Sequence, residues 1–151
     1  MELRILAVGR LRPGFREACD DYIRRLGRFA RVAEREVREA PGTGASRRDR
    51  EGEALLRGLP PDARLVVLDG AGQAWSSAEL ARQMGRWREG GRLVGLAIGG
   101  AEGHGEPVLA RATDRWSLGP LTLPHELARV IVYEQLYRAF TILEGHPYHR
   151  A

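Results

Sequence analysis

The apolar residues of this chain follow two patterns, strand-like and helical, which alternate along the sequence. Nearly continuous apolar runs at Glu2 to Gly9, Arg64 to Asp69 and Leu93 to Ile98 are typical of strands buried inside a parallel sheet. Imperfect alternation over Arg31 to Glu39 predicts a more exposed strand, and Arg115 to Leu118 is expected to form a short one.

Helical spacing of apolar residues fills the segments between these strands. Gly14 to Arg28 places its apolar side chains on one face, with arginines outside. Ser76 is a good N-cap for a helix that is expected to run to about Arg88, and Glu79 completes a capping box. Shorter helices are expected at Arg47 to Gly58, the segment least committed to a core, and at Pro107 to Thr113. Strands that alternate with helices predict an α/β fold with a mainly parallel sheet flanked by helices.

A last, long helix is expected after Pro124, and its apolar cover extends well past half of its circumference. Such a helix is either central to the core or packed against a second subunit. Glu134 and Arg138 are one turn apart, and their simplest interpretation is a surface ion pair. Arg129 falls inside the apolar sector, where a charge needs a partner or a ligand.

The length of 151 residues fits a single domain, residues 1–151. With 43% hydrophobic and 29% charged residues, the chain is too apolar for a disordered protein. It lacks an apolar run of membrane-spanning length, and its first residues do not resemble a signal peptide, so we expect a cytoplasmic protein without a membrane partner. The single cysteine, Cys19, excludes an internal disulfide and is expected to pack in a helix.

The charge is modestly basic. There are 24 basic residues, all arginine, against 20 acidic ones, which gives a formal net charge of +4. A surplus of this size suits a phosphate-bearing partner but leaves RNA or DNA binding open when taken alone.

Glycine is the compositional outlier, with 19 residues. In an open α/β sheet, ligands bind beyond the carboxyl ends of the strands, which nominates three loops: Asp69 to Gly72, Gly99 to Gly105, and Gly119 to Pro124. The first loop fits a plain turn equally well. The second lacks the G-x-G-x-x-G register of a dinucleotide site, so NAD is not expected. The apolar third loop has free backbone groups that suit a flat ring.

The chain ends in EGHPYHRA, a segment rich in side chains that bind polar ligands. The histidines His125, His146 and His149 offer neither HExxH spacing nor a nearby cysteine, so no metal site is predicted. We expect this tail to bind a polar, planar substrate, with His or Arg orienting or deprotonating it.

Three motifs carry a resemblance to a known family. LDGAGQAWSSAELA, IGGAEG, and above all SLGPLTLPHELARVIVYEQLYRA with the terminal HPYHR resemble the bacterial ribosomal RNA large-subunit pseudouridine N3-methyltransferases of the SPOUT superfamily. The resemblance spans essentially the whole chain. It implies an α/β fold with a C-terminal trefoil knot, S-adenosylmethionine as cofactor, and a homodimer formed through the C-terminal helix. The implied substrate is a pseudouridine in the helix-69 loop of 23S rRNA within the ribosome.

The same resemblance assigns residues to roles. Implied cofactor contacts are Leu68, Gly99, Gly100, Gly103, Leu118, Gly119, Pro120, Leu121, Thr122 and Leu123. Arg138, Tyr148 and His149 match positions associated with substrate binding and methyl transfer across the dimer interface. His125 and Arg129 are assigned to the substrate side, Arg129 as a support for the loop or the dimer. The turn GPL after Ser117 and Leu118 departs from the family's usual Ser-Lys-Met type, which matters little if the contacts are made by the main chain.

Two other functions stay open at this stage. The chain is alternatively a non-catalytic RNA-binding module, or an α/β enzyme for another adenosine ligand. Binding of S-adenosylmethionine separates these possibilities. The helix from Arg47 to Arg57 has no assigned role, and contact with the ribosome is our hypothesis for it.

Overall fold

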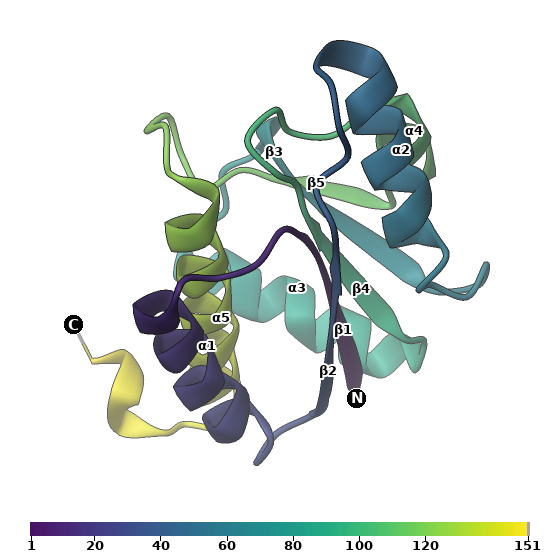
Figure 1. Cartoon of the computed structure of the whole chain (residues 1–151). Coiled ribbons are helices and arrows are strands. Elements are labelled where there is room, and N and C mark those ends of the chain that lie inside the picture. Colours follow the sequence, from purple (N-terminus) through teal and green to yellow (C-terminus); the bar gives the residue numbers. More distant parts are fainter. Residues whose placement is uncertain (151) are drawn as a thin grey trace.

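The computed structural model describes residues 1–150 and is built on one five-stranded sheet with the strand order β2-β1-β4-β3-β5. Every neighbouring pair of strands is parallel, so the predicted α/β class is confirmed (Figure 1). The strands are β1 (Glu2–Val8), β2 (Arg31–Val37), β3 (Arg64–Gln73), β4 (Val94–Ile98) and β5 (Asp114–Trp116).

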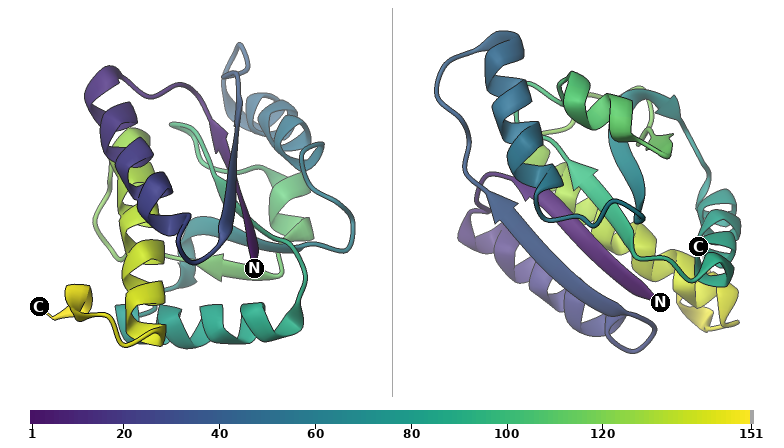
Figure 2. Two further views of the ribbon diagram at one scale, coloured as in Figure 1. Left: turned by 90° about the horizontal axis from the view of Figure 1, so that it is seen from below. Right: turned by 90° about the vertical axis from the view of Figure 1, so that its right-hand side faces the viewer.

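Helices cover both faces of this sheet (Figures 1 and 2). They are α1 (Pro13–Leu26), α2 (Gly44–Leu56), α3 (Ser77–Gly90), α4 (Glu106–Arg111) and α5 (His125–Leu143), followed by the 3-10 helix η1 (Pro147–His149). Alternation along β1 divides the core, because Leu3 and Ile5 face α1, α3 and α5 while Leu6 and Val8 face α2 and α4. None of the described helices is long and apolar enough to cross a membrane.

Helix α5 resolves one of the two alternatives for its wide apolar surface. It lies between α1 and α3, with Val132, Leu136 and Phe140 fully buried. It is therefore central to the core of a single protomer. Dimer formation through its remaining surface, like the trefoil knot, stays a prediction.

Two expectations from the sequence are wrong. Strand β3 does not stop at Asp69 but continues to Gln73, which pairs with Trp116 after a register shift. The close approach depends on Gly72, where a Cβ atom would lie 2.6 Å from the backbone of Arg115. Helix α2 is also more committed to the core than expected, because Glu51, Gly52 and Leu55 are buried.

Candidate functional site

The carboxyl ends of β3, β4 and β5 meet at one cavity of about 200 Å³. All three segments nominated as loops contribute to its wall, although the first, Asp69 to Gly72, lies within β3 and is not a loop. Its lining includes eight of the expected cofactor contacts, namely Leu68, Gly99, Gly100, Gly103, Leu118, Gly119, Leu121 and Leu123. Pro120 and Thr122 belong to the same loop but do not line the cavity. The cavity is also lined by Ile98, Trp116 and Ala128, which were not predicted because apolar residues at such positions are typical of a protein core.

The glycine loop after β4 is folded tightly against itself. A Cβ atom on Gly99 would lie 3.0 Å from the backbone of Gly103. Gly103 has a φ of +76°, in the left-handed region, and its N–H donates a 3.1 Å hydrogen bond to the Gly100 carbonyl. Glycine is therefore needed here for close packing and for backbone conformation, and the main chain itself forms this wall.

The loop before α5 forms the opposite wall. Gly119 has a φ of +111°, and its N–H donates to the Ser117 hydroxyl at 3.1 Å. Leu121 is 78% exposed at the rim, which is unusual for a large apolar side chain. An exposed leucine beside an apolar cavity suits a surface that a ligand or a second subunit covers.

The first turn of α5 places His125 in the cavity wall, and Arg12, in the segment before α1, holds this turn in place. Both the backbone N–H and the Nε of Arg12 donate to Glu126, at 2.7 and 2.8 Å, and the pKa of Glu126 is lowered mainly by the backbone hydrogen bond. The buried Arg129 donates to Glu36 and, at 2.8 Å, to the Gly9 carbonyl. Arg129 thus has the internal partner that its apolar position required, and it supports the loop after β1.

The catalytic candidates gather at another part of α5. The Nε of Arg138 and the Tyr148 hydroxyl both donate to Oε1 of Glu134, at 2.9 and 3.1 Å. The Arg138 guanidinium also lies over the Tyr148 ring, 5.0 Å from its centroid, and that ring packs on Tyr137. The expected ion pair between Glu134 and Arg138 is confirmed, but it is one part of a larger cluster.

The electrostatics of this cluster restrict the role of Tyr148. Burial, together with hydrogen bonds to Tyr22 and Glu134, raises the pKa of Tyr148. The phenol therefore stays protonated near neutral pH and is a hydrogen-bond donor rather than a base. In His149, the buried Nδ1 has no hydrogen-bond partner among residues 1–150, so this nitrogen is uncommitted.

The cavity and the cluster lie far apart in one protomer. At 1.5 Å per residue, the helical rise separates His125 from Arg138 by roughly 20 Å. Figure 1 shows the loop before α5 and the tail with η1 toward opposite ends of that helix. The structure therefore brings Leu68, Gly99 and Leu118 together, and separately Arg138 and Tyr148, but does not bring the two groups to each other.

The imidazole of His104, in the loop after β4, is within 3.1 Å of the Ala97 carbonyl, and burial lowers its pKa. His104 is thus a neutral structural residue. Among the described residues, no group of three or more His, Cys, Asp or Glu side chains is placed to hold a metal ion.

Comparison with known proteins identifies the class. The family model described as "Predicted SPOUT methyltransferase" matches residues 1–149. This chain therefore belongs to the SPOUT methyltransferase family, as the resemblance in its motifs predicted.

Curated relatives match along their whole length. The chain is 48% identical over 154 residues to "Ribosomal RNA large subunit methyltransferase H" of Anaeromyxobacter sp. (strain Fw109-5), covering 99% of this chain and 100% of that protein. It is 44% identical over 158 residues to the protein of the same name from Pseudomonas aeruginosa (strain LESB58), with the same coverage. A solved structure titled as a probable rRNA-methyltransferase from Porphyromonas gingivalis matches at 14% identity and a TM-score of 0.48, covering 94% of this chain and 69% of that one.

Proposed function

We propose that this protein methylates 23S rRNA with S-adenosylmethionine, at N3 of a pseudouridine in the helix-69 loop of the assembled ribosome. Family membership and the names of full-length relatives support rRNA methylation. The choice of pseudouridine N3 and of helix 69 rests on the resemblance of the motifs. The observation that carries the proposal is the cavity formed by the three loops expected to hold the cofactor.

The cavity suits an adenosine ligand held by main-chain groups. Gly99 and Gly103 leave the backbone without side-chain cover, while Leu118 and Trp116 supply apolar surface for a flat ring. Its volume, about 200 Å³, is below the roughly 300 to 1,000 Å³ usual for small-molecule sites. We therefore expect the exposed Leu121 to close over the ligand, or a second subunit to complete the site.

Bound S-adenosylmethionine would supply an electrophilic methyl group on a sulfonium. The residues of the chain must then orient the base and handle its N3 proton, because an imide nitrogen is a good nucleophile only after deprotonation. Arg138 is fixed by Glu134, and Tyr148 is a neutral donor, so both suit binding and orientation of the base. His149, with an uncommitted Nδ1, is our candidate to position or deprotonate it.

The separation of the cavity from Arg138 supports a homodimer. Within one protomer the tail cluster cannot reach a ligand beside His125, because roughly 20 Å of helix lies between them. Two α5 helices packed against each other in opposite directions would bring the cluster of one protomer to the cavity of the other. Leu127, the other large apolar side chain left exposed in the described part, lies on α5 where such contact is expected.

The decisive experiment combines cofactor binding with methyl transfer. Calorimetry should detect S-adenosylmethionine binding, and the purified protein should methylate ribosomes that lack this modification. We expect weaker activity on free 23S rRNA, because a domain this small needs the ribosome to define its target. Absence of cofactor binding would overturn the proposed function, and equal activity on naked rRNA would contradict its ribosomal context.

The dimeric site has its own test. An Arg138→Ala protein and a Gly99→Val protein should each be inactive, because one lacks the base-binding group and the other the cofactor loop. Mixing them allows heterodimers that contain one intact composite site, so activity should recover partially. If no activity returns while mixed dimers are detected by mass spectrometry, the two groups do not act across an interface.

A further inference from the structure

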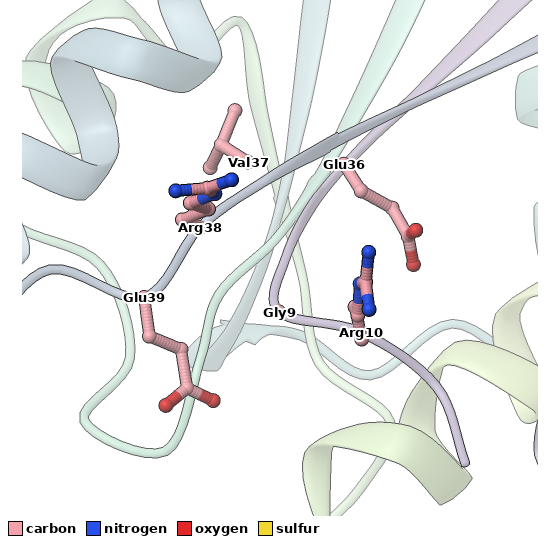
Figure 3. A pocket seen from close by; sticks show the side chains of 6 residues that line it. All are labelled: Gly9, Arg10, Glu36, Val37, Arg38 and Glu39. Carbon is pink, nitrogen blue, oxygen red and sulfur yellow. The ribbon is translucent and has the colours of Figure 1, made fainter.

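Two large hollows lie along the free edge of the sheet, away from the cofactor cavity. One, of about 740 Å³, is lined by Gly9, Arg10, Glu36, Val37, Arg38 and Glu39 (Figure 3). The other, of about 750 Å³, includes Arg4, Arg35, Glu36 and Arg57 in its lining. Glu36 of β2 lines both, so the hollows adjoin at this edge strand, whose position at the rim of the sheet is visible in Figure 2.

The acidic side chains of these hollows are neutralised by other arginines. Glu34 accepts hydrogen bonds from Arg16 and Tyr133. Glu36 pairs with Arg129, and Glu39 lies 3.4 Å from Arg47. Glu34 and Glu36 therefore contribute little net negative charge to the hollows, whereas Glu39 shares Arg47 with Glu51 and keeps part of its charge.

The arginines of the hollows are not used in the same way. Arg10, Arg35, Arg38 and Arg57 are exposed, and within residues 1–150 none of their guanidinium groups forms an ion pair or a hydrogen bond. We call these four residues the β2 arginine track. By contrast, two arginines of α2, the helix first proposed to contact the ribosome, already have partners within the chain. Arg47 binds Glu51, and Arg50 binds the Pro41 carbonyl.

One part of the track lies at the same end of the sheet as the cofactor cavity. Because all strands are parallel, Arg10 and Arg38, which follow β1 and β2, lie at the same end of the sheet as Leu68 and Gly99. Arg35 and Arg57 extend the positive charge away from that end along the sheet edge, with the Arg35 side chain packed over Gly58.

We propose that the β2 arginine track binds the sugar-phosphate backbone of ribosomal RNA beside the target loop. Guanidinium groups without protein partners match phosphates in charge and hydrogen-bonding geometry. The competing explanation for the track is that charged residues protect an exposed edge strand from pairing with another chain. The inference rests on the proposed function, because it assumes an RNA substrate.

The test compares two double variants with a matched control. Arg10→Gln/Arg38→Gln and Arg35→Gln/Arg57→Gln each remove two track residues, while Arg82→Gln/Arg86→Gln removes the same charge from the exposed face of α3. Methylation of unmodified ribosomes should show a KM raised about tenfold for the track variants, with calorimetric cofactor affinity unchanged. The slope of log affinity against log salt should fall by roughly one per lost phosphate contact.

The outcomes separate the alternatives. An equal rise of KM in the α3 control would assign the effect to net charge and overturn the inference. Weakened ribosome binding with an unchanged salt slope would indicate a ribosomal protein as the partner, and unchanged KM would leave only edge protection. Each of these results presupposes that the wild-type protein methylates ribosomes, so failure of the proposed function is recognised separately.

Discussion

The hydroxyl of Tyr148 donates a 3.1 Å hydrogen bond to Glu134, the carboxylate that also holds Arg138. This contact folds the tail back onto α5 and joins three residues from two segments into one cluster. It also means that Tyr148 acts with its neighbours, because its ring lies on Tyr137 and beneath the Arg138 guanidinium.

Tyr148→Phe should reduce methyl transfer without affecting the cofactor. The variant keeps the ring contacts but loses the bond to Glu134, so we expect kcat to fall by roughly tenfold, in line with loss of about one hydrogen bond in a site. Cofactor affinity by calorimetry should stay within about twofold, because the expected cofactor contacts come from the residues that line the cavity and not from Tyr148. Full activity in both Tyr148→Phe and Glu134→Gln would show that the cluster has no part in the reaction.

Because the pKa of Tyr148 is raised by burial, its phenol is not the group that titrates near neutrality. The pH-rate profile of Tyr148→Phe should therefore run parallel to that of the wild type between about pH 6 and pH 9. Loss of a rising limb in the variant would instead identify Tyr148 as the base.

Gly99→Ala should weaken cofactor binding. The added Cβ would lie 3.0 Å from the Gly103 backbone, which cannot move aside as a flexible side chain does. The loop must shift, and we expect S-adenosylmethionine affinity to fall by roughly tenfold. Gly14→Ala is a suitable control, because its Cβ would meet nothing within 4 Å. Equal affinity for S-adenosylmethionine in the two variants would show that the loop after β4 does not bind the cofactor.

Arg129→Met should destabilise the fold. The Arg129 side chain is 1% exposed and joins α5 to Glu36 of β2 and to the Gly9 carbonyl. Removing one member of a buried pair costs about 3 to 5 kcal/mol, and the lower end applies because Glu36 is partly exposed to water. Urea unfolding measures the loss, and Arg86→Met on the surface of α3 should change stability by less than about 0.5 kcal/mol.

Glu34→Gln should cost stability at neutral pH and much less in acid. Although burial alone would raise the pKa of Glu34, hydrogen bonds from Arg16 and Tyr133 outweigh it and lower the pKa. The ionised form therefore stabilises the fold above the ordinary carboxyl pKa, and this contribution is lost as pH falls through the lowered value. Urea midpoints of wild type and variant should differ at pH 7 and should converge as the pH falls below the ordinary carboxyl range and through the lowered pKa of Glu34. Glu17→Gln, an exposed position, should show no such convergence.

Cys19 should be inert in the folded protein. The thiol is fully buried, and burial raises its pKa to about 11. A thiol reagent at about pH 8 should modify Cys19 only after unfolding in urea. The preference for the neutral thiol stabilises the fold below the unfolded pKa and is lost as pH rises through the folded value. Rapid labelling of the native protein would contradict this burial.

The sequence by itself determined most of the elements and the segments that line the cavity. Continuous apolar runs sufficed for the parallel strands, because a strand covered on both faces needs no polar side, and the glycine loops were found since ligands gather at the carboxyl ends of such strands. The capping box at Ser76 also formed as predicted, with the Ser76 hydroxyl accepting from the Glu79 N–H at 3.2 Å. Periodicity and capping depend on neighbours in the sequence, so they can be read from it.

Only the tertiary structure decided the contacts between distant segments. The extension of β3 to Gln73 depends on pairing with Trp116, and the partner of Arg129 is Glu36 on the edge strand. The same holds for the distance between the cavity and Arg138, which the length and direction of α5 impose. Pairing across long sequence separations leaves no local pattern, because its free energy comes from groups that meet only after the chain has folded.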